Sequence, residues 1–399
     1  MSRQVYGNEA PSSRIAVVGV GGGGGNALNR MIESAFEGVD FIAINTDLQD
    51  LRKSKARFRI QIGEKLTQGL GAGANPEIGQ RAAEESRNII KEYLKEANLV
   101  IITAGMGKGT GTGASPVVAS IAKEMGKLVV AVVTKPFYLE GRHRIVNADI
   151  GIENLSKVAD AYIVVANENL VALSNNATMS EAFEYADGVL RQCILGISDV
   201  IINTQTLNID FADLRTVLKD MGRAYLGIGS GSGTDRVINA VKSAVNIRLQ
   251  DIRINNATSV MLYVKAKHEV TVEEIDKAAV LVREAVHKDA NIIFGFDFRD
   301  DLPHDVEIML IATGFGDEKR GERREARPET GLAPTRTETP VEPRPQSAPN
   351  TAADGGNIAR TIIHPVDDED DDDEDDDDVA PWLKEKRNRS RNTFGDDKH

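Results

Sequence analysis

The segment Ile15-Ala16-Val17-Val18-Gly19-Val20-Gly21-Gly22-Gly23-Gly24-Gly25-Asn26 joins an apolar, β-branched run to five consecutive glycines. The apolar run predicts a buried strand, and the glycines open a predicted helix. Small residues at such a junction let backbone N–H groups approach an anion at the positive end of the helix. We therefore expect a phosphate-binding loop after the first strand of a sheet.

A second glycine-rich loop occupies residues 105–113, which read Gly-Met-Gly-Lys-Gly-Thr-Gly-Thr-Gly between another predicted strand and helix. In the first loop, Gly19, Gly21 and Gly24 satisfy the fingerprint G-x-G-x-x-G, which suggests a dinucleotide such as NAD. An NAD enzyme needs only one such loop, whereas two loops at neighbouring strand ends suit a triphosphate with Mg²⁺. Because Lys108 is followed by glycine, the chain has no P-loop of the form G-x-x-x-x-G-K-[ST].

Short β-branched runs alternate with amphipathic ones from Arg14 to about Phe315, which is the pattern of βα units around a parallel sheet. Pro76 is expected near the start of a helix that runs to about Tyr93, and Pro116 is expected to open another helix. The strands of this Rossmann-like domain are predicted at 15–20, 41–45, 99–103, 128–134 and 162–166.

A long helix is predicted from Ser180 to about Val200, with an apolar face that includes Phe183 and Cys193. We expect it to lie buried between two domains, the second an α+β domain. Its strands are predicted at 260–266, 291–298 and 306–313, and its helices at 211–219, 234–245 and 272–287. The predicted units are a flexible N-terminus (1–12), a nucleotide-binding domain (13–179), the central helix (180–203), the second domain (204–316), a linker (317–378) and a terminal docking segment (379–399).

The composition excludes several classes of protein. The formal net charge of -13 falls to -1 when the twelve acidic residues Asp367–Asp378 are set aside, so no broad basic face predicts binding to nucleic acid. The lone Cys193 excludes an internal disulfide and a cysteine-built metal site. No run approaches the length of a membrane helix and the start lacks a secretory signal, so we expect a cytosolic chain without direct membrane insertion.

The C-terminal region differs from the rest of the chain in composition. Seven of the thirteen prolines fall between Pro328 and Pro365, which predicts a disordered linker that the acidic run keeps extended. Beyond the run, an apolar island at 379–383 carries the only tryptophan, Trp382, and basic residues follow it. This composition favours a docking peptide over a featureless tail.

The motifs G-G-G-G-N at 22–26, G-K-G-T-G-T-G at 107–113 and N-I-D-F-A-D at 208–213 together resemble the tubulin/FtsZ superfamily, and bacterial FtsZ in particular. Residues 69–77 and 134–137 are similarly FtsZ-like, and the likeness covers about 13–316. The resemblance implies a cytoplasmic GTPase of cell division that forms a homopolymer at the division site, on the inner face of the membrane. Residues 379–392 would then bind membrane-tethering and assembly-regulating division proteins.

The resemblance also implies which residues contact the nucleotide. Three loops would hold the phosphates, one carboxylate and one guanidinium would contact ribose and phosphate, and three residues would hold guanine. Mg²⁺ would be held mainly by phosphates and water, without protein ligands. The residues implied to bind GTP are Gly21, Gly22, Gly23, Gly24, Gly25, Asn26, Ala72, Gly73, Ala74, Gly107, Lys108, Gly109, Thr110, Gly111, Thr112, Thr134, Glu140, Arg144, Asn167, Phe183 and Asp187.

By the same resemblance, Asn208, Asp210 and Asp213 are catalytic and act in the nucleotide site of the next subunit, so that hydrolysis requires polymerisation and turnover drives disassembly. The residues alone admit a simpler role, because Asp210 is a natural N-cap and Asp213 is the matching capping-box residue. Likewise, without the resemblance, Glu140 and Arg144 are ordinary solvated charges.

The chain departs from the family in three places. Lys108 stands where glycine is usual, so a strained backbone there would cost about 1 kcal/mol; solvent exposure is the favoured placement of its side chain. The segment 203–207 lacks the usual Pro-Gly turn, and Gly188 replaces a polar residue. Two alternative functions stay open, namely a tubulin-like filament without a division role and an NAD-binding regulator.

Overall fold

The computed structural model of the chain describes residues 13–33, 38–172, 178–202, 207, 209–247, 250–268 and 270–316. The predicted N-terminal segment 1–12, the linker 317–378 and the docking segment 379–399 lie outside the described residues. So does Asn208, one of the three candidate catalytic residues, and so do residues 203–206 of the segment 203–207.

Among the described residues, the first sheet has seven strands in the order β3-β2-β1-β4-β5-β6-β7, and every neighbouring pair is parallel. The five predicted strands are present, whereas β3 and β7 were not predicted because each is too short to show an apolar pattern. The strands are β1 (Ile15–Val20), β2 (Val39–Asn45), β3 (Phe58–Gln61), β4 (Leu99–Gly105), β5 (Leu128–Lys135), β6 (Ala161–Ala166) and β7 (Gly222–Arg223).

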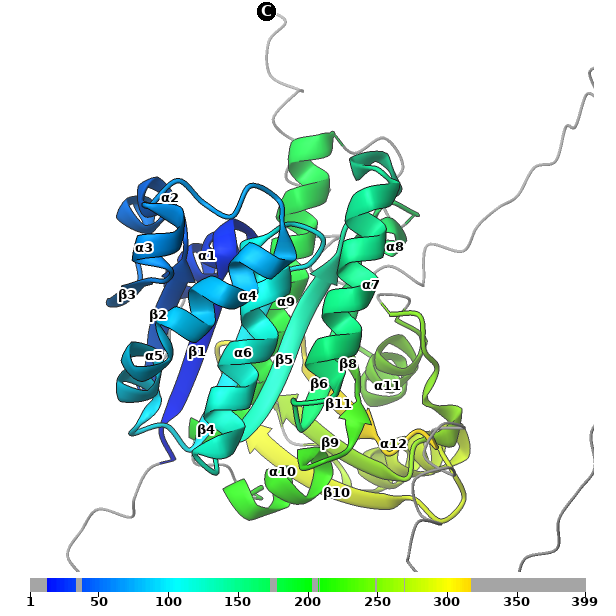
Figure 1. Cartoon of the computed structure of the whole chain (residues 1–399). Coiled ribbons are helices and arrows are strands. Elements are labelled where there is room, and N and C mark those ends of the chain that lie inside the picture. Colours follow the sequence, from blue (N-terminus) through cyan, green and yellow to red (C-terminus); the bar gives the residue numbers. More distant parts are fainter. Residues whose placement is uncertain are drawn as a thin grey trace, which may run out of the picture. The chain divides into compact units, whose positions relative to one another are not determined.

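Helices cover both faces of this sheet (Figure 1). One face, which carries Ala16 and Val18, packs against α4 to α7, and the other, which carries Ile15 and Val17, packs against α1 and α9. The helices up to the central one are α1 (Gly21–Ile32), α2 (Leu48–Lys53), α3 (Glu64–Thr67), α4 (Pro76–Glu85), α5 (Arg87–Leu94), α6 (Thr110–Glu124), α7 (Arg142–Ser156) and α8 (Asn167–Ala172), with the short 3-10 turn η1 (Tyr138–Glu140).

Two proline-based predictions need correction. The helix that Pro76 starts ends at Glu85, and a separate helix follows from Arg87, because the chain bends at Ser86. Pro116 lies inside α6, which begins six residues earlier at Thr110, so the prediction that Pro116 opens the helix was wrong. Because proline has no N–H, the carbonyl of Thr112 lacks the helix bond that residue 116 would otherwise donate, and the usual preference of proline for the first position does not hold here.

The central helix α9 (Met179–Ile202) begins one residue before the predicted helix 180–203, and residue 203 lies outside the described residues. At about 1.5 Å per residue its 24 residues span about 36 Å. Its apolar face is buried as predicted, and Cys193 is 1% exposed, which raises the pKa of the thiol to about 12. Phe183 is the exception on this face, because 42% of it is exposed.

The second sheet has four described strands in the order β10-β9-β11-β8. Its elements share one apolar cluster with α9 and with the adjacent face of the first sheet, so the core continues across α9. The elements are α10 (Phe211–Leu218), β8 (Tyr225–Gly231), α11 (Arg236–Asn246), η2 (Ile254–Asn256), β9 (Ser259–Ala266), α12 (Val272–Ala285), β10 (Asn291–Phe298) and β11 (Val306–Thr313), of which β8 was not predicted.

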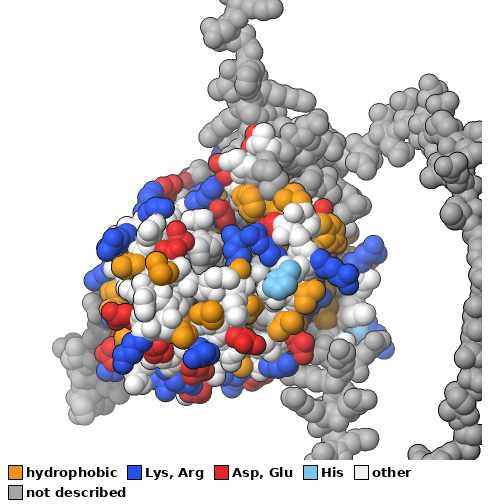
Figure 2. Space-filling view, turned by 45° about the horizontal axis from the view of Figure 1, so that its top comes forward, with side chains coloured by type: hydrophobic (Ala, Val, Ile, Leu, Met, Phe, Trp, Pro, Cys, Tyr) orange, Lys and Arg blue, Asp and Glu red, His pale blue; other side chains and the backbone are white. Residues whose placement is uncertain are grey.

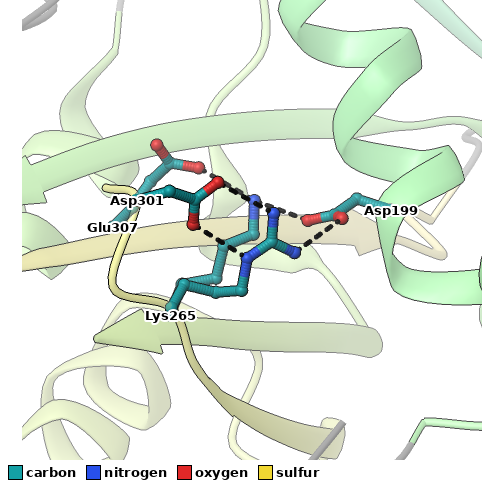
Figure 3. A network of polar contacts seen from close by, with 5 residues as sticks. Asp199, Lys265, Asp301 and Glu307 are labelled. Carbon is teal, nitrogen blue, oxygen red and sulfur yellow. Dashed lines mark hydrogen bonds and ion pairs between the residues drawn. The ribbon is translucent and has the colours of Figure 1, made fainter. Parts of the chain in front are cut away.

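A network of charged side chains joins α9 to this second sheet (Figure 3). Asp199 of α9 contacts Lys265 of β9 at 2.7 Å and Arg299 at 3.4 Å. Lys265 also contacts Glu307 of β11 at 3.1 Å, and Arg299 contacts Asp301 at 3.1 Å. Because Asp199 is only 2% exposed, its charge depends on these cations for compensation.

Candidate functional site

The two glycine-rich loops meet at the carboxyl edge of the first sheet, where β1 and β4 end side by side with Val20 paired to Ala104. Gly21 has a φ of +72°, and a Cβ on it would lie 2.8 Å from the backbone nitrogen of Gly111. Only glycine combines this left-handed backbone with so close an approach. The structure thus brings together two loops that lie about 85 residues apart in the sequence.

The first turn of α1 has an inner and an outer side. On the inner side, a Cβ on Gly24 would lie 2.4 Å from the carbonyl oxygen of Thr103, so glycine lets the helix pack on β4. On the outer side, a Cβ on Gly25 would have nothing within 4 Å, and Asn26 is exposed. No side chain caps the helix and no acidic residue lies in its first turn, which leaves N–H groups of Gly22 and its neighbours available to an anion.

The second loop is ordered by its own hydroxyl groups. The backbone N–H of Gly107, whose φ is +104°, donates to Thr112 Oγ1 at 2.8 Å. Thr110 Oγ1 lies 2.7 Å from Thr46 Oγ1 across the site. These bonds place backbone donors and hydroxyls at the start of α6, as a phosphate site requires.

Lys108 lies in this loop with its side chain exposed, as favoured from the sequence. Its φ is not positive, because the left-handed residues other than glycine in the described chain are Gln68, Ala74, Asp220 and Asp235. The strain that a positive φ would have imposed at this position is therefore absent. The loop accommodates a lysine without backbone cost.

The third loop, Ala72 to Ala74, lies against the second one. A Cβ on Gly109 would be 2.7 Å from the Cβ of Ala72, which is buried. Gly73 and Ala74 both have left-handed backbones, with φ values of 56° and 60°. Asn75 then caps α4 by accepting from the backbone N–H of Glu77 at 2.9 Å.

Glu140 and Arg144 are paired to each other rather than solvated separately. Arg144 donates to Glu140 Oε2 at 2.6 Å, and Glu140 Oε1 accepts from the backbone N–H of Phe137 at 3.1 Å. The start of α7 reaches the second loop, because a Cβ on Gly107 would lie 2.7 Å from the carbonyl oxygen of Arg144. Thr134, also at this edge, accepts from the backbone N–H of Met106 at 2.9 Å through its carbonyl.

The residues expected to hold guanine fit a planar polar ligand. Asn167 begins α8 directly after β6, and its Oδ1 is buried with no hydrogen-bond partner in the described chain. A buried acceptor of this kind is normally hydrogen-bonded, and an N–H group on the edge of a base is a suitable donor. The half-exposed ring of Phe183 packs edge-on against Phe137, with ring centroids 5.2 Å apart, so one ring face is left for stacking.

Asp187 is held by an ion pair that the sequence did not suggest. Its Oδ2 lies 3.1 Å from Arg30 Nε of α1. Burial raises the pKa of the Asp187 carboxyl to about 6, although Arg30 acts in the opposite direction, and the neighbouring Glu184 adds to the rise. A carboxylate in this position can accept from the N–H groups of guanine while Arg30 compensates its charge.

The acidic pair predicted to be catalytic lies at the other edge of the sheet. The helix that it caps, α10, leads into Gly222, which pairs with Ala161 at the start of β6, whereas the phosphate loops follow the strand ends. Figure 1 shows α10 at the bottom and the loops before α1 and α6 at the top. The structure does not bring Asp210 and Asp213 to the loops of their own chain.

Asp210 and Asp213 form the capping box that the sequence predicted. Asp213 N–H donates to Asp210 Oδ1 at 2.7 Å, and Asp210 N–H donates to Asp213 Oδ2 at 3.2 Å. In the part of the chain that the structure describes, the second oxygen of each carboxylate has no hydrogen-bond partner. Capping therefore uses one oxygen of each carboxylate, and the other oxygen is available to a water molecule.

The sequence reasoning missed three residues that contact predicted nucleotide-binding residues. Thr46 follows β2, and the rule that ligands bind beyond the carboxyl ends of parallel strands could have found it. Nothing in the spacing of Arg30 pointed to Asp187, and Phe137 read as part of a motif without a role. All three position groups that the sequence did identify.

Two searches of the described residues bear on other kinds of site. They contain no group of three His, Cys, Asp or Glu side chains that could hold a metal ion. No helix among them combines the length and apolar character that crossing a membrane requires.

Comparisons with known proteins agree with this geometry. Residues 14–175 match the description Tubulin/FtsZ family, GTPase domain, and residues 222–316 match FtsZ family, C-terminal domain. Among solved structures, an empty FtsZ dimer of M. jannaschii is 40% identical, with a TM-score of 0.72 over 77% of this chain and 89% of that one. CetZ2 from Haloferax volcanii, a GTPγS-bound protofilament, shares the fold at 21% identity, with a TM-score of 0.66 over 77% of this chain and 95% of that one.

The 40% identity to FtsZ over 89% of the solved chain, together with two family matches in sequence order, leads to one conclusion. The chain belongs to the tubulin/FtsZ family of GTPases, and within it to FtsZ.

Proposed function

We propose that the chain is a GTP-dependent filament protein of cell division, in which head-to-tail assembly completes the GTPase site and hydrolysis drives filament turnover. GTP is the substrate of the family's GTPase domain, and the phosphate loops and the guanine-side residues Asn167, Phe183 and Asp187 would hold it.

The observation that carries the proposal is the separation of the two half-sites. The phosphate loops follow β1 and β4, whereas Asp210 and Asp213 lie at the start of α10, at the amino edge of the sheet. The helix α9, about 36 Å long, runs between the two regions. One copy cannot bring its acidic pair to its own nucleotide, but a second copy stacked along the axis of α9 can.

The chemistry assigned to the completed site is hydrolysis of the terminal phosphoanhydride. A water oxygen attacks the γ-phosphorus while the bond from phosphorus to the β–γ bridging oxygen breaks, which gives GDP, phosphate and a proton. The carboxylate oxygens of Asp210 and Asp213 that capping leaves available would accept from this water and align it. Backbone donors of the loops around Gly21 and Gly111 would stabilise the developing phosphate charge.

Mg²⁺ would be held mainly by phosphate oxygens and water, because the site presents hydroxyls and backbone donors rather than a set of carboxylates. Thr110 and Thr46, which share a hydrogen bond at the second loop, are among the hydroxyl groups at this edge. Bound there, the ion would neutralise charge between the β- and γ-phosphates.

The test is the release of phosphate from GTP across a range of protein concentrations, for the parent and for Asp213→Asn. Asparagine keeps an oxygen for the capping bond to Asp210 N–H but lacks the charge, so the variant should fold normally and bind GTP. We expect the parent's rate per subunit to rise from near zero above a threshold concentration. The rate of phosphate release per subunit should be at least about a hundredfold lower in the variant than in the parent.

Glu274→Gln is the matched control, since Glu274 is the acidic residue of a second capping box, with Thr271 on α12. It should keep the rate within about twofold. A parent rate per subunit that does not depend on concentration would contradict a GTPase site completed by assembly. A loss in the control as large as in Asp213→Asn would show that the acidic pair acts only as a cap.

The division role rests on the match to FtsZ and on the terminal segment 379–392, whose Pro381-Trp382-Leu383 is similar to the family's docking peptide. We propose a cytoplasmic location at the division site, with the segment binding membrane-tethering and assembly-regulating proteins. A fluorescent fusion should form mid-cell rings, and Trp382→Ala should disperse them while phosphate release stays unchanged. Filaments that never gather at the division site would favour the alternative, a tubulin-like filament without a division role.

A further inference from the structure

The outer edge of the first sheet carries a cluster of cations, one of which, Lys53, also lines the pocket beside Gly22 and Gly25 of the nucleotide site. It begins at the end of α2 and continues through β3, where five of eight consecutive residues are basic. All five are exposed, and they are separated by the buried Ser54 and Ala56 and the partly buried Phe58. We call this surface the basic edge, which consists of Arg52, Lys53, Lys55, Arg57 and Arg59.

Most of this charge is uncompensated. Lys55 pairs with Glu33, but in the described part of the chain the other four cations form no ion pair. Arg57 lies over the ring of Phe58, with its guanidinium carbon 5.1 Å from the ring centroid. Asp40 lines the same surface cleft as Arg57 without pairing to it. The basic edge therefore presents a surplus of positive charge to solvent.

The position of the basic edge makes it available to a partner. β3 is an outermost strand of the first sheet, on the opposite border from β7, so no further strand of the described residues covers it. Figure 1 places α2 and β3 at the left border, and Figure 2 shows Lys and Arg side chains, with Asp and Glu side chains among them, along that border of the molecule. Arg57 and Arg59 alternate with the inward-facing Ile60 and Phe58, as side chains of a strand do.

We propose that the basic edge is a docking surface for the acidic run Asp367–Asp378, from the same chain or from a neighbouring copy. Twelve consecutive carboxylates are opposite in charge to a five-cation surface, in a chain whose charge is otherwise nearly balanced. Every copy carries both partners, so the surface always meets the run at equal stoichiometry and, within one chain, at a raised local concentration.

The length of the intervening chain permits this contact. Fifty residues separate Gly316 from Asp367, and at about 3.3 Å per residue they reach up to about 165 Å. A compact body of about 300 residues has a radius of gyration of about 19 Å. The run can therefore reach the basic edge of its own chain or of the next one.

Other polyanions fit the surface less well. A membrane surface calls for an apolar side chain beside the cations, but Phe58 is occupied by Arg57 on one side and by the ring of Tyr93, 5.5 Å away. A nucleic acid would have to compete with an acidic run that the chain itself supplies. The contact with the run is electrostatic, so it should weaken as salt screens the charges.

The first experiment measures binding of a dye-labelled peptide of residues 365–379 to the full-length chain in which Asp367–Asp378 are replaced by serine and asparagine. We expect saturable binding that weakens steeply between 50 mM and 500 mM salt. Arg52→Gln/Arg57→Gln/Arg59→Gln should weaken it about tenfold or more. The matched control, Lys219→Gln/Lys242→Gln/Lys288→Gln, removes three exposed cations from the second domain and should leave it within about twofold.

Equal affinity in both triple variants would overturn the assignment, provided that both melt like the parent.

In the unmodified chain, a zero-length carbodiimide reaction should join Lys53 or Lys55 to a peptide of the acidic run. Mixtures of isotopically light and heavy chains distinguish contacts within a copy from contacts between copies. Strong binding of the unmodified chain to phosphatidylserine vesicles or to duplex DNA, lost in the basic-edge variant, would instead assign the surface to that polyanion and overturn the proposal.

Discussion

Lys265 Nζ lies 2.7 Å from Asp199 Oδ2, and this ion pair ties the second sheet to the central helix. Burial alone would lower the pKa of Lys265, but Glu307 and Asp199 outweigh that effect and raise it. The lysine therefore stays charged throughout the neutral range. Because Asp199 is almost fully buried, the pair depends on both partners being present.

Replacing Asp199 by asparagine should lower the free energy of unfolding by about 3 kcal/mol, because Lys265 and Arg299 lose the anion that both contact. Urea unfolding of the two chains measures the difference. Lys277→Gln is the control, since its pair with Glu273 is exposed and its loss should cost less than about 0.5 kcal/mol. Similar values for the two variants would mean that the network adds nothing to stability.

Binding of the nucleotide should depend on pH through Asp187. The carboxyl has a pKa of about 6 in the free chain, and a guanine that donates to it would favour the ionised form. Affinity for GTP should therefore fall as the pH drops through 6, by up to about tenfold per unit. The GTP phosphates also titrate near pH 6, so Asp187→Asn serves as the reference. The pH dependence of GTP affinity that remains in this variant is due to the phosphates.

The same group affects the free chain in the opposite sense. Because the folded pKa of Asp187 lies above the usual value of 3.8, the contribution of this group to stability is full below pH 4 and is lost as the pH rises through 6. Identical pH profiles of GTP affinity for the parent and Asp187→Asn would contradict a guanine contact at this residue.

Two neighbouring glycines of α1 should respond oppositely to alanine. Gly25→Ala should stabilise the free chain by about 0.5–1 kcal/mol, because nothing lies near the new methyl group and alanine favours the helix. Gly24→Ala should destabilise it by about 1–3 kcal/mol, because the methyl group meets the carbonyl oxygen of Thr103. Thermal unfolding without nucleotide measures both.

The outer position also tests the phosphate site. In Gly25→Ala, affinity for GTP should fall about tenfold although stability rises, since the added methyl group fills space assigned to the ligand. Unchanged affinity in this variant would place the phosphates elsewhere.

Lys108 should behave as an ordinary exposed residue of a right-handed or extended backbone. Lys108→Ala should change the free energy of unfolding by less than about 0.5 kcal/mol, whereas Lys108→Gly should lower it by about 0.5–1 kcal/mol relative to alanine. Equilibrium unfolding in urea distinguishes the two. A glycine variant more stable than the alanine variant would mean that the residue needs a left-handed backbone after all.

The strands and loops that carry a strong local signal were predictable. The five longer strands of the first sheet and the helix α9 stand out by apolar run or apolar periodicity. The strand β8 was missed because its sequence, Tyr-Leu-Gly-Ile-Gly-Ser-Gly, reads as a turn. The glycines of β8 are explained by tertiary packing, since a Cβ on Gly227 would lie 1.9 Å from the carbonyl oxygen of Ala244 on α11. No local sequence pattern reveals such a close approach.

The site was predictable only in part for the same reason. Glycine spacing alone indicated a phosphate loop at Gly21, but apolar periodicity placed Phe183 in the core, and only the family resemblance assigned it to guanine. In the structure, 42% of Phe183 is exposed. Apolar periodicity cannot predict this exposure, because it does not distinguish a side chain that packs in the core from one that contacts a ligand. The pairing of Arg30 with Asp187 joins two helices far apart in the chain and had no local signature.

The burial of Cys193 leaves the native chain without a reactive thiol. With its pKa near 12 and 1% of its surface exposed, the sulfur is essentially never a thiolate at neutral pH. A cysteine introduced at any exposed position becomes the single site for maleimide labelling, with no need to remove the native one. Spectroscopic probes placed at the loop edge of one copy and near α10 of another could then report the spacing of subunits in an otherwise wild-type filament.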